Sequence, residues 1–579
     1  MHFQWFTCTL LFAAHATALN RRSTLQTCPL LAKQYPSPVG LANETLFQTA
    51  IESINATLNR GLNVVPYNET TFSLGMFSAL SEGLEYQYHH GDAALTASTS
   101  GTRDINADSI YRIGSISKLL TVYIFLLAAD GEKYFNTPVL ELVPELQQLA
   151  EDGWNPETPD FSEITIGDLA GQMAGLARDF GLADVTSDSV DVPVSIANMP
   201  AFPQLPADQI PDCGHPSANS SWLTCSQEDY LQGVATGSPI FPAAYTPVYS
   251  NEAFALIAIA LSNITGSSFE AVFNETLRNT LSLADTYYTV PSDAIGRGAI
   301  PGTLLSTGFD GELGVFSPAG GYFSTLNDFS CLGRAILNST LLSKAQTRRW
   351  FKPTSFLEDY AQGVGRPWEI FRRKVSGYSV DLYTKAGDVG TYSSFFCLVP
   401  TYDIGITLFT AWDPAGSSGG VVRDELPNLL ANTILPALDQ VAKGQAIVNF
   451  AGHYSNPQTN SSITISTDSN PALKVSAWVS NGVDIFNDVL GLLAPDLDLR
   501  ILPNELYQGG KVGFTSYYQS AVAKPADGTW YLQCAGWIDV DELTVGNVPL
   551  GQLVFSMGED GKASSVESRA LRQVLVRQG

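Results

Sequence analysis

The residue pair best placed for chemistry is Ser115 and Lys118, three positions apart near the start of an apolar stretch, residues 112–131. In a helix, residues i and i+3 share a face, and a serine in the first turn lies near unpaired backbone N–H groups. Apolar surroundings lower the pKa of a lysine, and a neutral lysine could accept the serine proton. The pair fits a nucleophilic serine with a lysine base, although a helix cap beside a lysine that reaches solvent fits it too.

Histidine offers no evident alternative base. After residue 18 the chain has His89, His90, His215 and His453. The first two are adjacent in an expected strand and point to opposite faces, and none has the spacing of metal ligands. One G-x-S-x-G match, residues 416–420, is Ser/Gly-rich and has only His453 downstream, so we interpret it as a flexible loop. The chain has no C-x-x-C pair, and we expect neither a metal nor a cofactor.

Two further triplets follow the serine–lysine pair in chain order. They are Tyr249-Ser250-Asn251 and Lys385-Ala386-Gly387. With the segments ITIGDLAGQMAGL, YSNEAFALIAIALSNITGSSFE and PAGGYFSTLNDFSCLGRAIL, they resemble the serine β-lactamase / penicillin-binding-protein family, in its class C-like and esterase branch. The resemblance covers about residues 80 to 440 and suits a secreted, fungal-type member with a C-terminal β-domain.

The resemblance implies a role for each matching residue. Ser115 would be the nucleophile and Lys118 its base. Tyr249 would be a second base, with a phenol pKa lowered by neighbouring lysines. Asn251 would orient the substrate, and Lys385 would add positive charge beside Tyr249.

The third triplet also bears on the oxyanion and the substrate. The resemblance implies an oxyanion hole made by the backbone N–H groups of Ser115 and Asp388, the residue after Gly387 on an edge strand. The family's β-lactamases and carboxypeptidases usually have Thr or Ser where this chain has Ala386. An alanine cannot donate a hydrogen bond to a substrate carboxylate, and the Asp388 carboxylate would repel one. We therefore expect a neutral ester, lactone or amide rather than a β-lactam.

Two similar strings lie outside this order. Tyr454-Ser455-Asn456 comes after Lys385 and is followed by a proline, and Lys511-Val512-Gly513 fits K-x-G. We interpret both as ordinary strand and turn residues.

The elements that must position the site have mixed α and β patterns. A buried helix is expected over 251–266, a Gly turn and a second helix over 318–337, three strands between 377 and 412, and a closing helix over 423–441. The resemblance implies an α+β fold, the β-lactamase/transpeptidase-like sandwich of an antiparallel sheet flanked by helices. Beyond about residue 445, short alternating segments predict a separate antiparallel β-barrel or sandwich.

These patterns divide the chain into four parts. We expect a signal peptide over 1–18, an N-terminal segment over 19–80, a catalytic domain over 81–442 and a β-rich domain over 445–579. Residues 180–248 are rich in Pro, Ser and Asp without sustained periodicity, which is typical of a lid-like insertion.

Three features predict a secreted, extracellular protein. An N-terminal apolar run ends at a small-x-small site. Among the six cysteines after Cys8, only Cys213 and Cys225 are assignable to a disulfide, because they bracket a short polar loop. N-x-[ST] sequons, the acceptor sites for N-glycosylation, are dense. They begin at Asn43, Asn55, Asn68, Asn219, Asn263, Asn274, Asn338 and Asn460.

The bulk composition limits the partners. The formal net charge is −26, which argues against nucleic acid and anionic membranes, since both attract basic patches. We expect a small-molecule or peptide acyl substrate; the sequence leaves the oligomeric state open. The leading hypothesis is a secreted serine hydrolase that forms an acyl-enzyme. The alternatives are an acyltransferase with the same intermediate and an inactive binding or scaffold protein.

Overall fold

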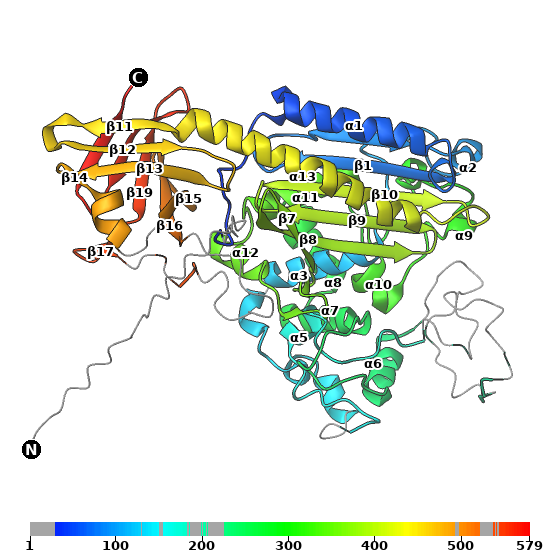
Figure 1. The fold of residues 1–579 in the computed structure, drawn as a ribbon. Coiled ribbons are helices and arrows are strands. Elements are labelled where there is room, and N and C mark those ends of the chain that lie inside the picture. Colours follow the sequence, from blue (N-terminus) through cyan, green and yellow to red (C-terminus); the bar gives the residue numbers. More distant parts are fainter. Residues whose placement is uncertain are drawn as a thin grey trace, which may run out of the picture. The chain divides into compact units, whose positions relative to one another are not determined.

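The computed structural model describes six long stretches, which form two units (Figure 1). One unit is residues 31–449, and the other contains residues 450–579. The stretches are 29–128, 130–149, 155–181, 225–492, 497–520 and 543–579, with a few single or short pieces between them. The expected signal peptide, Cys28, His215, Asn219 and Cys534 lie outside the described residues.

An eight-stranded antiparallel sheet organises the first unit, in the order β2-β1-β10-β9-β8-β7-β6-β5. The three strands predicted between 377 and 412 are neighbours within it. The strands are β1 (Thr70–Ser78), β2 (Tyr86–His90), β5 (Ser355–Phe356), β6 (Gln362–Val364), β7 (Glu369–Val375), β8 (Tyr378–Val389), β9 (Tyr392–Val399) and β10 (Ile404–Trp412).

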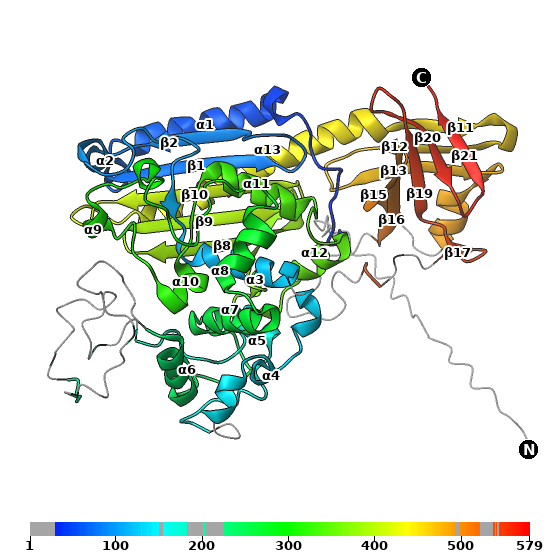
Figure 2. The ribbon, with the colours of Figure 1, turned by 180° about the vertical axis from the view of Figure 1, so that it is seen from behind.

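Helices cover both faces of this sheet, as the two views show (Figures 1 and 2). One face packs against α1 (Thr45–Gly61) and α13 (Gly420–Phe450) in a single apolar cluster. The opposite face packs against α3 (Ser117–Ala128), α7 (Glu252–Thr265), α10 (Ser317–Gly320) and α11 (Leu326–Leu337). Because both faces are covered, the central strands are buried nearly end to end rather than on alternate residues. This arrangement confirms the expected sandwich of a sheet flanked by helices.

The N-terminal segment predicted over 19–80 is not a separate part of the fold. Strand β1 pairs with β10 along its whole length, from Thr70 opposite Trp412 to Ser78 opposite Ile404. Helix α1 presents Phe47, Ile54 and other apolar residues to the same core. The sequence analysis did not assign a strand here, although residues 71–76 alternate between polar or small and apolar side chains.

The predicted insertion, residues 180–248, contains a helix that the sequence analysis did not expect. Helix α6 (Gln227–Thr236) starts at Ser226, whose hydroxyl accepts a hydrogen bond from Asp229 N at 3.1 Å. Most of residues 182–224 lie outside the described ranges. The predicted disulfide between Cys213 and Cys225 is present, whereas Cys331 and Cys397 are free thiols.

The second unit is an antiparallel barrel, which decides between the two predicted β architectures. Eight strands follow the order β12-β11-β21-β20-β19-β16-β15-β13, and pairing of β13 with β12 closes the ring. Rings of Tyr454, Phe514 and Phe555 meet inside it. The strands are β11 (Gly452–Asn456), β12 (Ser461–Ser466), β13 (Leu473–Ser480), β15 (Leu497–Gln508), β16 (Lys511–Ser520), β19 (Gln552–Met557), β20 (Ala563–Ser568) and β21 (Gln573–Arg577).

No single helix in the described part of the chain is long and apolar enough to cross a membrane. The bent pair Glu252–Thr265 and Phe269–Arg278 satisfies the length and composition test only when taken together.

Candidate active site

Ser115 lies in a short 3-10 turn, Gly114–Ile116, that joins β3 (Tyr111–Arg112) to α3. The α-helix begins at Ser117, later than the start of the expected apolar helix, because Tyr111 and Arg112 pair with β4 (Phe323–Ser324) instead. The turn still brings Lys118 Nζ to 2.9 Å from Ser115 Oγ.

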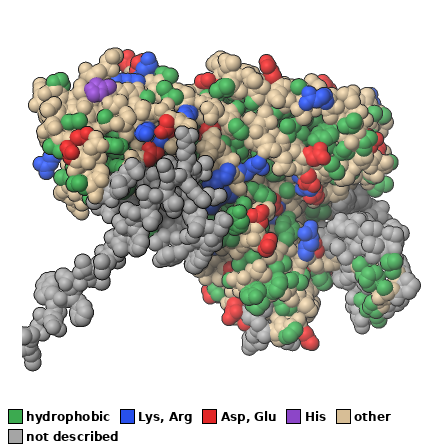
Figure 3. Space-filling view, viewed as in Figure 1, with side chains coloured by type: hydrophobic (Ala, Val, Ile, Leu, Met, Phe, Trp, Pro, Cys, Tyr) green, Lys and Arg blue, Asp and Glu red, His purple; other side chains and the backbone are tan. Residues whose placement is uncertain are grey.

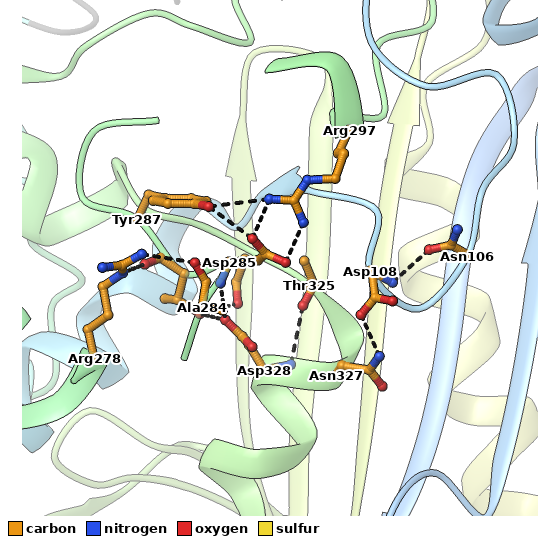
Figure 4. A network of polar contacts seen from close by, with 12 residues as sticks. Asn106, Asp108, Arg278, Ala284, Asp285, Tyr287, Arg297, Thr325, Asn327 and Asp328 are labelled. Atoms are coloured by element: carbon orange, nitrogen blue, oxygen red, sulfur yellow. Dashed lines mark hydrogen bonds and ion pairs between the residues drawn. The ribbon is translucent and has the colours of Figure 1, made fainter. Parts of the chain in front are cut away.

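A polar network braces the strand pair that leads to Ser115 (Figure 4). Asp328 in the first turn of α11 accepts hydrogen bonds from Asp285 N and Thr286 Oγ1, both at 2.8 Å. Arg297 binds both oxygens of Asp285, at 2.5 Å each. Asn327 donates to Asp108 at 2.6 Å. The network therefore ties the start of α11, just after β4, to the segment that precedes β3.

Lys118 is fully buried, and its ammonium nitrogen lies among three oxygens. They are Ser115 Oγ at 2.9 Å, Asn251 Oδ1 at 2.5 Å and the backbone oxygen of Ala319 at 2.7 Å. Burial lowers the pKa of Lys118, and the charge of Lys385 lowers it further, against an opposing effect of Tyr249. A lysine that reaches solvent, the alternative left open by the sequence, does not occur here.

The three oxygens differ in what they can do. The Asn251 and Ala319 oxygens are carbonyl oxygens and only accept hydrogen bonds, whereas the serine hydroxyl can donate one. A neutral lysine has two N–H groups and one lone pair. When its two N–H groups are on the carbonyl oxygens, the lone pair faces Ser115 Oγ. The arrangement can therefore accept the serine proton without histidine.

Tyr249 lies between the two lysines of the site. Lys118 Nζ and Lys385 Nζ are 5.0 and 5.2 Å from the centre of its ring. Burial alone would raise the pKa of the Tyr249 phenol, but the charges of Lys118 and Lys385 and a hydrogen bond with Ser115 outweigh it, so this pKa falls below its usual value. The phenol is thereby suited to exchange protons next to Ser115.

Asn251 is held by a carboxylate that the sequence analysis did not identify. Its Nδ2 donates to Asp179 Oδ1 at 2.6 Å, while its Oδ1 accepts from Lys118. Its backbone N–H also donates to the oxygen of Arg178 at 2.8 Å. Asp179 therefore fixes which end of the Asn251 amide faces Lys118.

Lys385 is buried and pairs with a second residue that the sequence analysis missed, Glu369 on β7. Glu369 Oε1 accepts from Lys385 Nζ at 2.5 Å, and Oε2 accepts from Ala386 N at 2.9 Å. Burial would lower the pKa of Lys385, but the charges of Glu369 and Tyr249 outweigh it, so this pKa is raised. Lys385 therefore stays a cation beside Tyr249.

The edge of β8 and the serine turn approach closely through two glycines. A Cβ on Gly387 would lie 2.3 Å from the oxygen of Ile113 and 2.6 Å from Ser115 N. A Cβ on Gly114, which has a φ of +47°, would lie 2.7 Å from Asp388 N. Only glycine fits at these two positions.

This approach puts two backbone N–H groups beside the Ser115 hydroxyl. Pairing of β7 with β8 ends at Glu369 opposite Thr384, so among the described residues the β8 edge beyond Thr384 has no strand partner on that side. The N–H of Ala386 faces this edge, toward Glu369. Two residues on, the N–H of Asp388 faces it too. Ser115 N and Asp388 N are the two N–H groups that the resemblance assigns to an oxyanion hole, and that assignment stays a prediction.

The Asp388 side chain does not point toward the serine. Its carboxylate accepts hydrogen bonds from Ser393 Oγ at 2.5 Å and Arg423 Nη1 at 3.0 Å. Alternate residues of a strand face opposite sides, so Asp388 and Ala386 lie on the α13 face and Lys385 on the catalytic face. The expected repulsion of a substrate carboxylate by Asp388 is therefore offset by Arg423.

The other candidate residues lie elsewhere. Residues 416–420 join β10 to α13, and the Ser418 hydroxyl accepts from Gly420 N at 3.2 Å at the start of that helix. His89 Nδ1 bonds Ser73 at 2.9 Å, and His453 Nδ1 bonds Thr464 at 3.1 Å. The strings at 454–456 and 511–513 are in barrel strands β11 and β16, as expected.

Comparisons with known proteins agree with this architecture. The family described as beta-lactamase matches residues 75–426, and a second family, described as a beta-lactamase-like C-terminal domain, matches residues 442–579. A beta-lactamase-like protein of Arthroderma benhamiae is 25% identical over 581 residues, covering 93% of this chain and 92% of that protein. A probable hydrolase, M10, of a Phoma species is 27% identical over 492 residues, covering 83% and 77%.

A solved structure matches this chain at a lower sequence identity than these two relatives. A beta-lactamase/D-alanine carboxypeptidase from Yersinia pestis is 19% identical, with a TM-score of 0.47, over 66% of this chain and 99% of its own.

The match to the beta-lactamase family model alone covers more than half of the 579 residues. The chain belongs to the beta-lactamase family.

Proposed function

We propose that this protein is a serine hydrolase that forms an acyl-enzyme on Ser115 with an ester, lactone or amide. The observation that carries the proposal is the position of Lys118 Nζ, which is 2.9 Å from Ser115 Oγ and also contacts two oxygens that can only accept hydrogen bonds. Membership of a hydrolase-rich family supports the same reaction class.

In the first half of the reaction, Ser115 Oγ attacks the substrate carbonyl carbon and its proton passes to Lys118 Nζ. The carbonyl oxygen becomes an oxyanion that accepts hydrogen bonds from Ser115 N and Asp388 N. When the tetrahedral species collapses, the bond to the leaving group breaks. The proton held by Lys118 reaches the departing oxygen or nitrogen through Tyr249.

In the second half, water attacks the acyl carbon and Tyr249 accepts a water proton. The cationic Lys385 stabilises the phenolate form of Tyr249 while it acts as base. Collapse releases the acid and returns a proton to Ser115 Oγ. An alcohol or amine in place of water would make the same intermediate an acyl donor, which is how a transferase would differ.

The third motif indicates the substrate class. Ala386 has no hydroxyl that could donate a hydrogen bond to a substrate carboxylate. We therefore propose uncharged ester or amide substrates in preference to β-lactams.

A substrate panel tests the proposal. A p-nitrophenyl ester should give a rapid burst of p-nitrophenol equal to the enzyme concentration. Esters should be turned over faster than D-amino-acid amides and a chromogenic cephalosporin. Ser115→Ala should lose the burst, whereas Ser418→Ala, in the G-x-S-x-G loop, should keep it. Absence of both a burst and steady turnover with every ester would favour the binding-protein alternative.

We also propose that the protein is exported. The disulfide between Cys213 and Cys225 supports this, because disulfides persist in oxidising compartments. Five sequon asparagines are exposed in the structure, so a glycosyltransferase could reach them: Asn43, Asn68, Asn263, Asn338 and Asn460.

A further inference from the structure

A cavity of about 380 Å³ lies between α13 and the sheet, on the face opposite Ser115. Its floor is made by side chains of β7, β8 and β9, including Phe371, Leu382 and Phe395, and its wall by α13, including Ala431 and Leu435. Protein interiors are close-packed, and a volume of this size falls within the range of small-molecule sites rather than of packing defects.

Prolines and small side chains occur in the elements that border the cavity. Helix α13 contains Pro427 and Pro436 in its interior, and a proline inside a helix removes a backbone hydrogen bond and bends the helix. Pro427 itself lines the cavity. On the facing walls the side chains of Ala386 and Ala431 are small, so the space between helix and sheet stays open.

The charged groups at the rim leave one arginine without an acidic partner. Arg372 pairs with Asp381 at 2.7 Å, and Arg423 pairs with Asp388 at 3.0 Å. Among the described residues, Arg373 has only a neutral partner, the Asn432 side-chain oxygen at 2.5 Å.

Two of the three acidic side chains of the lining are paired with a cation, and the third, Asp359, has neutral partners. Glu369 accepts from Lys385, and Asp424 lies 2.6 Å from Arg423. Asp359 accepts from Ala361 N and the Gln362 side chain. A ligand carboxylate would therefore find its counter-charge at Arg373.

We propose that this cavity binds an amphiphilic monocarboxylate, with its apolar chain against Phe371, Phe395 and Leu435 and its carboxylate on the Arg373 guanidinium. The apolar floor accounts for the chain, and a charge-assisted hydrogen bond accounts for the acid group. The ligand would contact Ala386 and Glu369, which adjoin Lys385 on the other face of the edge strand.

Calorimetric titration with decanoate and with decanol tests this proposal on the full chain. Decanoate should bind about tenfold more tightly than decanol, since it adds one charge-assisted contact. Arg373→Gln should remove that preference while leaving decanol binding unchanged. Ala431→Trp, which fills the cavity, should abolish binding of both ligands.

Two controls keep the test independent of folding and of the proposed reaction. Val421→Trp places the same side chain at an exposed position of α13 outside the cavity lining and should bind decanoate normally. Ser115→Ala should also bind it normally, because the cavity is on the other side of the sheet. The proposal is overturned if decanoate fails to bind, binds Ala431→Trp as well as the unmodified protein, or loses affinity in Ser115→Ala.

Discussion

Among single residues, Asp179 influences Lys118 most directly without touching the reacting atoms. Asp179 Oδ1 accepts a hydrogen bond from Asn251 Nδ2 at 2.6 Å. Asn251 Oδ1 in turn accepts a hydrogen bond from Lys118 Nζ at 2.5 Å. The Asp179 charge also raises the pKa of Lys118, opposing the effect of burial. Asp179 thus combines an orienting role with an electrostatic one, and substitutions can separate the two.

We expect Asp179→Asn to move the rising limb of the pH profile of kcat/KM to lower pH. The variant retains an oxygen that can accept from Asn251 but removes the negative charge. Without that charge the pKa of Lys118 falls, so its neutral, proton-accepting form is populated at lower pH. The profile is obtained from ester hydrolysis rates measured from about pH 5 to about pH 10, which is the range in which a perturbed lysine titrates.

Asp179→Ala is the matched comparison. It loses both the charge and the acceptor, so kcat should fall at every pH as Asn251 is free to turn. A rising limb that moves to higher pH in Asp179→Asn would show that the charge acts in the opposite sense.

Arg178 gives a prediction about substrate choice. Its side chain is 69% exposed, and its guanidinium carbon lies 4.9 Å from the centre of the Tyr249 ring. Arg178 also pairs with Asp179 at 3.4 Å, and it is an exposed cation beside Tyr249. Arg178→Gln should lower kcat/KM for a p-nitrophenyl hemisuccinate about tenfold and leave p-nitrophenyl butyrate unchanged. An equal loss for both esters would assign Arg178 a structural role only.

The sequence was sufficient to find the residues that stand in ordered triplets. Ser115, Lys118, Tyr249 and Lys385 meet in the structure because the family's order of motifs reflects a fold that brings them together. Asp179 and Glu369 were missed because each is a lone acidic residue whose partner is 72 or 16 positions away. No local pattern distinguishes such a residue from a solvated one.

At the scale of elements, the close approach of β8 to the serine turn requires Gly387. We expect Gly387→Ala to lower kcat by roughly 10²–10³-fold, because the new Cβ would overlap the Ile113 oxygen and displace Asp388 N from the nucleophile. Initial rates with a p-nitrophenyl ester provide the measurement, with thermal unfolding to confirm that the variant folds.

Gly444→Ala is the control for that substitution. Gly444 lies in α13 and a Cβ there would meet nothing within 4 Å. Alanine should leave kcat unchanged and raise the free energy of unfolding by up to about 1 kcal/mol, through helix propensity. If Gly387→Ala were as active as Gly444→Ala, the backbone of β8 would have no part in oxyanion binding.

The elements that the sequence predicted have strong periodic or apolar patterns. Helices α7 and α11 and strands β8 to β10 belong to this group. Strand β1 was not predicted, although its residues 71–76 alternate between polar or small and apolar side chains. Helix α6 was not predicted because it lies in a polar segment whose composition is typical of a loop. For α6, tertiary burial, which a short window does not contain, decided the structure.

At the scale of the whole molecule, the net charge is not gathered into one patch on the face that Figure 3 shows. The net charge is −26, yet acidic and basic side chains lie interspersed over the face shown in Figure 3. Such a surface suits a small acyl substrate bound in a local site better than a polyanion.

Export leads to a prediction about the glycosylation and the N-terminal cleavage of the expressed protein. Expression in a eukaryotic host should give a secreted protein whose mass falls after treatment with an N-glycosidase. Its first residue should follow Ala18. Asn338→Gln should remove one glycan, while Asn432→Gln, which is outside any sequon, should remove none. A protein retained in the cell with residues 1–18 intact would contradict export.

Labelling with a fluorophosphonate probe tests the central claim most directly, because the probe reacts with an activated serine and needs no knowledge of the substrate. We expect a single labelled peptide that carries the adduct on Ser115. Ser115→Ala should abolish labelling, and Lys118→Ala should slow it by roughly 10²–10⁴-fold, the usual contribution of a positioned base. Labelling that persists on another serine in Ser115→Ala would contradict the assignment of Ser115 as the nucleophile.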